Sequence, residues 1–253
     1  MEWFNEEEFL KFIALKKNRK YVLNLLEHGT ENYEEDYERE LKEHAAITIK
    51  DPLDLKRIQS YLKTNNEAAY ILWMIGQNTG CRGSDIVKLT VGDIRKAIKN
   101  RKMILIEEKI EHITQARIRN NRPVKKKTTK EIKRIVNLNK KLIEILKEFI
   151  YGKDAHEFLY PTSSKTGHIR RDSLGRIYKK ALVELKIATE DDIVGTHTPR
   201  KTFGYIQYNE HNQDINYVQN LFCHSSPKTT RVYIGLDEDT REDAADTMDK
   251  YSY

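Results

Sequence analysis

Apolar residues recur at helical spacing through much of this chain. They fall mostly three and four positions apart in residues 5–27, 51–78 and 139–151. Asp51 followed by Pro52 is typical of a helix start, and the Thr-Gly pair ending at Gly80 is typical of a helix end. These patterns predict a mainly α-helical protein.

Two short segments alternate between apolar and polar residues. Residues 103–110, MILIEEKI, and residues 131–138, EIKRIVNL, have the two-residue period of β-strands. They are separated by the basic segment HITQARIRNNRPVKKKTTK. The expected fold class is therefore mainly α with a small antiparallel β-hairpin.

Charge divides the chain into three parts. The formal net charge is +6, but residues 1–49 hold 12 acidic and 7 basic residues, and residues 234–253 hold 7 acidic and 2 basic residues. Each end therefore carries −5, which leaves +16 on residues 50–233. A basic body between acidic ends favours a polyanionic partner for that body. Solvated lysine faces with no such partner are the alternative interpretation.

The change of charge near residue 49 also predicts a domain boundary. Residues 1–47 would form a short acidic helical segment, and residues 48–253 the main domain with an acidic C-terminal tail. Cys81 and Cys223 fit neither a metal-binding spacing nor a disulfide framework, which favours a reducing compartment. Since no signal peptide or apolar run of membrane-spanning length is present, we expect a cytoplasmic protein without membrane association.

Four residues near the C-terminus have side chains suited to breaking a phosphodiester bond. His197 and Arg200 stand three positions apart, a spacing that brings them to one face of the first turn of a helix, where they could hold a phosphate. His224 precedes Tyr233 by nine residues, across a Ser-Ser-Pro turn that predicts a new helix. Each of the four could instead only pack or cap an element.

The order of these residues resembles the C-terminal signature of the tyrosine recombinases, the phage integrase family. The signature is HxxR, a histidine followed by two serines, and then TT-x-x-Y. Upstream, TGCRGSDIVKL is similar to the family's first arginine box, with Arg82 in the arginine position and Asp85 in the acidic position. The resemblance covers roughly residues 48–240 and implies the catalytic-domain fold of that family.

The resemblance implies a site-specific recombinase that cleaves and rejoins DNA through a 3′-phosphotyrosyl intermediate on Tyr233. Arg82 and Arg200 would bind the non-bridging phosphate oxygens as these gain charge. His224 would donate another hydrogen bond there, and His197 would accept the proton of Tyr233. Because the bond energy is kept in the covalent link, no metal, ATP or other cofactor is expected.

The family also has a catalytic lysine on the turn between two strands. Lys127 fits this position best, and Lys130 and Lys109 are alternatives because the basic segment is longer than is usual in the family. A basic loop that only lies along the DNA backbone is an equal alternative. Residues 168–186 are expected to form a basic helix that contacts phosphates more than bases.

The expected partner is double-stranded DNA. Recombination cuts four strands, so one tyrosine per chain requires a tetramer on DNA, and whether a helper DNA-binding protein also takes part stays open. Two rival functions remain. A non-catalytic DNA-binding accessory is one, because an acidic N-terminal segment of about 46 residues is too short for the family's N-terminal DNA clamp. A type IB topoisomerase is the other, although the acidic tail over residues 237–253 resembles one that recombinases exchange.

Overall fold

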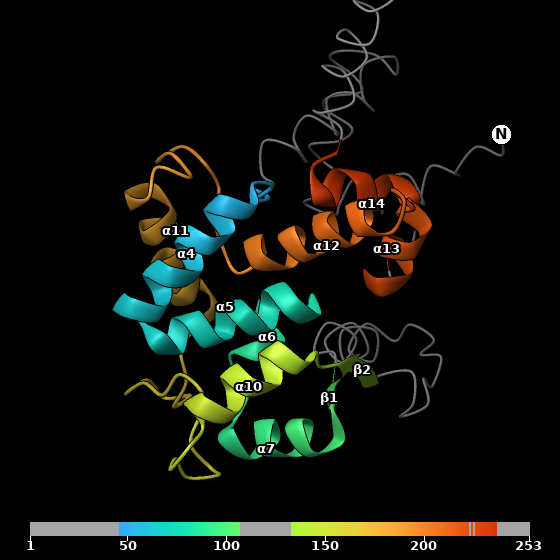
Figure 1. Ribbon diagram of the computed structural model, residues 1–253. Coiled ribbons are helices and arrows are strands. Elements are labelled where there is room, and N and C mark those ends of the chain that lie inside the picture. The colour runs from blue at the N-terminus through green and yellow to red at the C-terminus, as the bar shows by residue number, and fades with distance from the viewer. Residues whose placement is uncertain (1–45, 107–132, 223, 225, 237–253) are drawn as a thin grey trace, which may run out of the picture. The chain divides into compact units, whose positions relative to one another are not determined.

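The computed structural model describes residues 46–106, 133–222, 224 and 226–236. Figure 1 shows these residues as packed helices with one small two-stranded sheet, and the predicted fold class is confirmed. In chain order the elements are α4 (Pro52–Asn65), α5 (Glu67–Thr79), α6 (Gly83–Ile86), α7 (Val91–Asn100), β1 (Lys102–Ile106), β2 (Lys133–Asn137), α10 (Lys140–Phe149), α11 (Arg171–Glu184), α12 (Thr198–Glu210), α13 (Ile215–Phe222) and α14 (Pro227–Ile234).

Helix α4 begins and ends where its sequence predicts. The side chain of Asp51 accepts a hydrogen bond from the N–H of Leu53 at 2.7 Å, and Pro52 occupies the first turn. Asn66 then caps α5, which ends at Gly80 in the left-handed conformation. These caps are local interactions, so the sequence alone was sufficient to place both helices.

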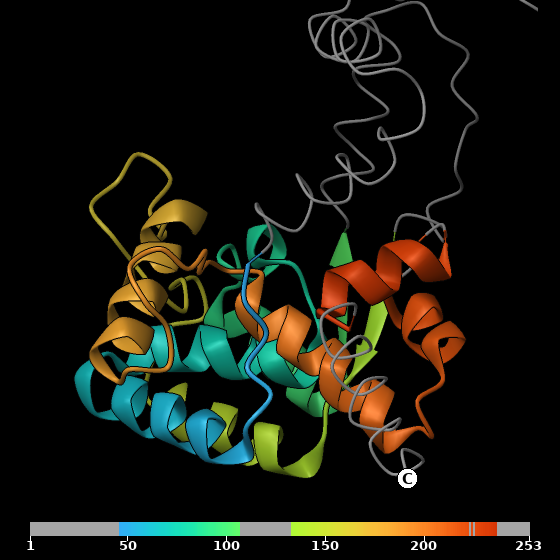
Figure 2. The ribbon, with the colours of Figure 1, turned by 90° about the horizontal axis from the view of Figure 1, so that it is seen from above.

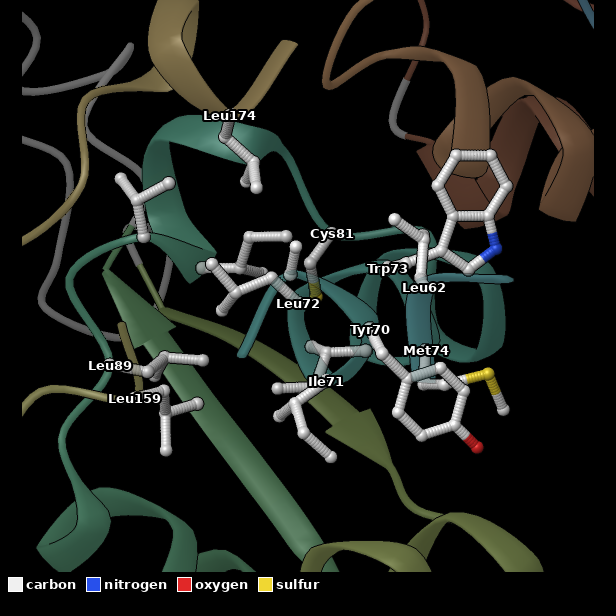
Figure 3. Packing of buried hydrophobic residues seen from close by; sticks show 14 of the residues in the cluster. Leu62, Tyr70, Ile71, Leu72, Trp73, Met74, Cys81, Leu89, Leu159 and Leu174 are labelled. Atoms are coloured by element: carbon white, nitrogen blue, oxygen red, sulfur yellow. The ribbon is translucent and has the colours of Figure 1, made fainter. Parts of the chain in front are cut away.

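Helix α5 is the centre of the domain. It packs against α4, α6, α10, α11 and α12, and most of its residues are buried. A helix that is apolar on all sides needs such a surround, because no face of it can lie in water. Figure 3 shows its side chains within the main hydrophobic core, where the rings of Trp73 and Tyr178 meet edge to face at 4.9 Å.

Strands β1 and β2 pair antiparallel, as predicted. Lys102 pairs with Asn137 and Ile106 with Lys133. Met103 and Leu105 are buried while Ile104 is exposed, which is the alternation expected of a strand with one face on the core. The rest of the predicted strand residues, and the basic segment between them, lie outside the described residues.

Three elements were not predicted from periodicity. Helix α7 starts with a capping box in which Thr90 and Asp93 bind each other's main-chain N–H groups. Helix α6 is only four residues long, and α13 is eight. Helices α6 and α13 carry too few turns for a hydrophobic period to be distinct.

The C-terminal helices form a second, smaller hydrophobic cluster. Helix α12 packs against α5 and also against α13 and α14, and Figure 2 shows α13 and α14 together beside α12. Within the described residues, no helix is both long and apolar enough to cross a membrane. The predicted segment 1–47, except for its last two residues, and the predicted tail 237–253 lie outside the described residues.

Candidate active site

The start of α12 places His197 and Arg200. His197 is the N-cap residue, and Pro199 follows in the first turn, where a helix has no partner for the missing N–H. The side chain of Arg200 is 2% exposed, whereas His197 is exposed. The two residues share one helix start, but one of them faces solvent and the other is buried.

The guanidinium of Arg200 joins segments that are far apart in sequence. Its Nη1 donates a hydrogen bond to the main-chain carbonyl of Gly80, at the end of α5. Its Cζ lies 4.3 Å from the centroid of the Phe222 ring, a cation–π contact. Because Gly80 precedes Arg82 by two residues, both predicted phosphate-binding arginines belong to the same part of the molecule.

The turn that carries Arg82 packs directly against the turn that carries His197. Arg82 is the N-cap residue of α6, and the predicted acidic partner Asp85 is buried in the same short helix. A Cβ placed on Gly83 would lie 2.3 Å from Oγ1 of Thr196, the residue before His197. Only glycine permits this approach, so the arginine box and the HxxR motif meet through it.

Tyr233 is held in the last turn of α14. The helix begins at the predicted Ser-Ser-Pro turn, where Oγ of Ser226 accepts a hydrogen bond from the N–H of Thr229 at 3.2 Å. The phenol ring of Tyr233 meets the ring of Phe222 edge to face, with 5.4 Å between the centroids. Phe222 therefore contacts both the buried Arg200 and the candidate nucleophile.

His224 lies beside Tyr233 and is oriented by a buried hydroxyl. The two rings are edge to face, with 5.1 Å between their centroids. Nδ1 of His224 and Oγ1 of Thr230 are 3.1 Å apart, and the same hydroxyl donates to the carbonyl of Ser226 at 3.1 Å. Since a hydroxyl has one hydrogen, Nδ1–H of His224 must donate to Thr230. Nε2 then carries a hydrogen only in the charged imidazolium.

The most direct contact in the site joins His197 to Tyr233. Nδ1 of His197 and the phenolic oxygen of Tyr233 are 3.1 Å apart, across 36 positions of sequence. This is within the range at which a base can accept a proton. The fold thus gathers the side chains of His197, Arg200 and His224 around that of Tyr233.

The surroundings of His197 keep its imidazole neutral. The pKa of His197 is lowered from 6.5 to about 4, mainly because the packed side of the imidazole loses its hydration. The positive charges of Arg200, Arg171, Arg82 and Lys201 act in the same direction. One side of the residue still faces solvent. A neutral imidazole can accept a hydrogen bond on Nδ1, so its protonation state near pH 7 suits a proton acceptor.

An open groove of about 400 Å³ lies next to His197. It is lined by residues 171–179 of α11, which include the basic Arg171, Arg176 and Lys179 and the acidic Asp172, and by residues 194–197, which lead into α12. Residues 168–186 were predicted to form a basic helix, and α11 confirms the helix. Its first turns point basic side chains toward the candidate site.

The predicted catalytic lysine is not placed by the structure. Lys127, and its alternatives Lys130 and Lys109, lie outside the described residues. In the sequence all three lysines fall between the described residues of β1 (Lys102–Ile106) and β2 (Lys133–Asn137). Their assignment stays a prediction.

Sequence reasoning missed three side chains that the structure places at the site. They are Arg171, whose charge acts on His197, Thr230, which orients His224, and Lys201, whose Nζ lies 6.0 Å from the centroid of the Tyr233 ring. Thr230 is part of the TT-x-x-Y pattern, which could have marked it. For Lys201 and Arg171 the sequence shows only two more basic residues in a basic segment.

Comparisons with known proteins agree with this arrangement. Residues 51–239 match the Phage integrase family. The probable integrase/recombinase YoeC of Bacillus subtilis (strain 168) is 30% identical over 201 residues, which make up 78% of this chain and 93% of that protein. The recombinase class predicted from the motifs agrees with both findings.

Solved structures of recombinases have a similar fold. The crystal structure of XerA recombinase matches with a TM-score of 0.55 and 16% identity, over 81% of this chain and 64% of that one. The XerH site-specific recombinase bound to a palindromic difH substrate matches with a TM-score of 0.51 and 19% identity, over 78% of this chain and 52% of that one. The present chain therefore spans about half to two thirds of these structures.

The family match extends over most of the domain that carries the site. It includes the arginine box, the HxxR helix and the helix of Tyr233, which the fold packs against one another. Together with the similarity to YoeC over nearly its whole length, this establishes that the chain belongs to the phage integrase family.

Proposed function

We propose that this protein is a site-specific tyrosine recombinase that cleaves and rejoins DNA through a 3′-phosphotyrosyl link on Tyr233. The observation that carries the proposal is the 3.1 Å distance between the phenolic oxygen of Tyr233 and Nδ1 of His197. Membership of the phage integrase family supports the same reaction class. The reaction forms one phosphodiester bond for each bond it breaks, so no external energy source is needed.

His197 is the proton acceptor for the attacking phenol. With its own hydrogen on Nε2, the neutral imidazole accepts the hydrogen of the Tyr233 hydroxyl on Nδ1. Tyrosine at its usual pKa near 10 is a weak nucleophile, so this help is needed. Loss of hydration is the larger cause of the low pKa of His197, and the nearby cations add to it. A bound phosphodiester offsets the charge of Arg82 and Arg200, which is the smaller part of that shift.

Arg82, Arg200 and His224 stabilise the charge on the phosphate. The non-bridging oxygens gain negative charge in the transition state, and fixed cationic donors stabilise that state more than the substrate. His224 donates to the phosphate through Nε2 when that nitrogen is protonated, because its Nδ1–H is bound to Thr230. The lysine between the strands, Lys127 in the best fit to the family, protonates the departing 5′ oxygen.

Double-stranded DNA is the substrate, and the assembly is a tetramer on that DNA. The net charge of +16 on residues 50–233 and the basic groove beside His197 support contact with the phosphate backbone. Two duplexes have four strands to cut, and each protomer supplies one nucleophilic tyrosine. A helper DNA-binding protein is a further partner that this scheme allows.

The test uses nicked DNA that traps the covalent link. Binding sites are first enriched from a random-sequence duplex pool with the full chain. Duplexes with an enriched site are then nicked next to the cleavage position, so that the released fragment diffuses away and religation stops. We expect an adduct that resists detergent and forms equally in EDTA. Tyr233→Phe should abolish it with little change in DNA binding, and Tyr217→Phe, in the same small cluster, should not.

Other results would assign the protein to another function. DNA binding by the wild type without any adduct would favour the non-catalytic accessory. Relaxation of supercoiled plasmid by a monomer, without exchange between two duplexes, would favour a topoisomerase. An adduct that persists in Tyr233→Phe would move the nucleophile to another residue.

A further inference from the structure

Lys201 is a buried lysine that the reaction described above does not use. Its side chain is 5% exposed, and it is the one lysine among the buried charged residues of the described chain. Lysine is rarely buried, because its ammonium loses hydration that the protein must replace. The position of this ammonium, between the linker that precedes α4 and the nucleophile, suggests what it does.

The linker over residues 46–49 holds Lys201 from one side. Nζ of Lys201 donates a hydrogen bond to the main-chain carbonyl of Ala46. The N–H of Ile49 donates to Oγ1 of the next residue in α12, Thr202, at 3.1 Å, and this bond is buried. Figure 2 shows the linker running alongside α12. The ammonium of Lys201 is therefore held by a main-chain carbonyl of a linker that is itself bonded to α12.

The other side of the ammonium faces the nucleophile. Nζ of Lys201 lies 6.0 Å from the centroid of the Tyr233 ring, and Cζ of Arg200 lies 5.9 Å from the same centroid. At this range a cation is attracted to the electron-rich ring. The attraction grows when the phenol oxygen becomes negative, because a full charge replaces a quadrupole. Water screens the interaction little, since both cations are buried.

We propose that Lys201 is a positioning residue for the nucleophile, which holds a buried positive charge beside Tyr233 and stabilises the anionic phenol as it attacks phosphorus. The proposal rests on the proposed function, in which Tyr233 attacks DNA. The proton of the phenol still goes to His197, and Lys201 exchanges none. The other charged or titratable groups next to Tyr233 in the described residues are His197 and Arg200 on α12 and His224 before α14, and Arg82 and Arg171 act on His197.

The test removes the charge while keeping the volume. In Lys201→Met the stem stays and the ammonium is lost, whereas Lys201→Arg keeps the charge. The rate of adduct formation is measured from pH 6 to pH 10 on the nicked duplex. We expect Lys201→Met to be about tenfold slower at pH 7, with its rising limb displaced upward by about one pH unit. Lys201→Arg should recover most of the rate and the wild-type profile.

Two further variants separate charge from packing. Lys50→Met removes a neighbouring lysine that follows the same linker, whose Nζ lies 5.6 Å from the centroid of the Tyr205 ring, and it should keep the wild-type pH profile. Lys201→Gln is neutral but can still donate to Ala46. It should behave like Lys201→Met, and it replaces that variant if the latter does not fold, as judged by circular dichroism.

The outcomes are distinct from those that test the reaction itself. A wild type that forms no adduct contradicts the proposed function. If the wild type does form the adduct, the role of Lys201 is overturned by a wild-type pH profile in both neutral variants. It is also overturned if the neutral variants lose the same factor in rate at every pH and Lys201→Arg does not restore the rate. Such a loss would come from packing alone.

Discussion

The two hydrophobic clusters hold different parts of the candidate site. The larger cluster surrounds α5 and extends to α4, α7, α10 and α11. In the described part of the chain, the smaller one has four buried hydrophobic residues, which are Val218, Phe222, Ile234 and Leu236. Partly buried aromatic side chains pack around them. Arg82 follows directly from the large core, while Tyr233 packs in the small cluster and His224 contacts the ring of Phe222 there.

The two clusters differ in size, so they should hold the phosphate-binding arginines and the nucleophile with different rigidity. A segment fixed by many buried contacts opens only at high free energy, whereas a segment fixed by few contacts opens at low free energy. Arg200 connects the two, since it binds Gly80 on one side and stacks on Phe222 on the other. We infer that the two phosphate-binding arginines are rigid and that the helix of Tyr233 is more easily displaced.

The largest expected effect comes from a substitution between α12 and the small cluster. A Cβ on Gly204 would lie 2.6 Å from the ring of Phe222 and 2.7 Å from Cγ2 of Ile234, and both side chains are buried. Gly204→Ala must therefore displace α13 or α14, and a shift near 1 Å at a nucleophile costs about 100-fold in rate. The measurement is adduct formation on the nicked duplex.

The control for this prediction is Gly152→Ala. Gly152 has a φ of +74°, and a Cβ added there would meet no other atom within 4 Å, so the change strains the main chain without touching the site. It should lower the melting temperature slightly and keep the rate. Equal rates in both variants would show that the small cluster does not control the nucleophile.

A matched pair of phenylalanines compares the two clusters directly. Phe222 is buried in the small cluster and Phe149 in the large one. Leucine at either position should cost about 1–2 kcal/mol of stability. We expect Phe222→Leu to slow adduct formation about tenfold, because Arg200 and Tyr233 both lose a ring contact. Phe149→Leu should lower the melting temperature and leave the rate of the folded protein unchanged, and the reverse ranking would contradict the comparison.

A smaller effect is expected from the hydroxyl that orients His224. Thr230→Val keeps the shape but removes the partner of Nδ1. A lost hydrogen bond of about 1 kcal/mol corresponds to a roughly fivefold slower reaction. Thr229→Val is the control, since the hydroxyl of Thr229 lies 2.9 Å from Oγ of Ser226 in the exposed cap of the same helix. Adduct rates that fall equally in both variants would point to the helix cap instead.

The smallest expected effect is on the dependence of the rate on pH. Because the pKa of His197 is lowered to about 4, this residue stays neutral between pH 7 and pH 5 and its protonation should not slow the reaction there. A histidine at its usual pKa of about 6.5 would lose more than tenfold at pH 5. Titration of the imidazole signals by NMR, assigned with His197→Gln, measures the pKa directly, and a value near 6.5 would contradict the burial and charge described here.

The same shift affects stability with a defined sign. The unfolded chain binds a proton at His197 below about pH 6.5, whereas the folded protein does so only below about pH 4. The free energy of unfolding therefore decreases as the pH falls from 6.5 to 4. His197→Gln should remove that part of the decrease, which denaturant titrations at several pH values would detect.

Local interactions made much of this protein predictable from its sequence. The cap at Asp51, the end of α5 at Gly80 and the alternation of Met103 and Leu105 depend on neighbours within a few residues. The order and spacing of the arginine box, HxxR and TT-x-x-Y were sufficient for the family. The same spacings selected His197 and Tyr233, whose side chains meet in the folded protein.

Only the tertiary structure decided which basic residues are buried and which of them act on the nucleophile. Arg200 and Lys201 are adjacent in the sequence and look alike there. They become different because Arg200 binds Gly80, 120 positions away, and Lys201 binds Ala46, 155 positions away. Burial and the pKa of His197 result from such long-range contacts, since desolvation and charge depend on distance in space. The helical period and the caps depend only on how far apart residues are in the sequence.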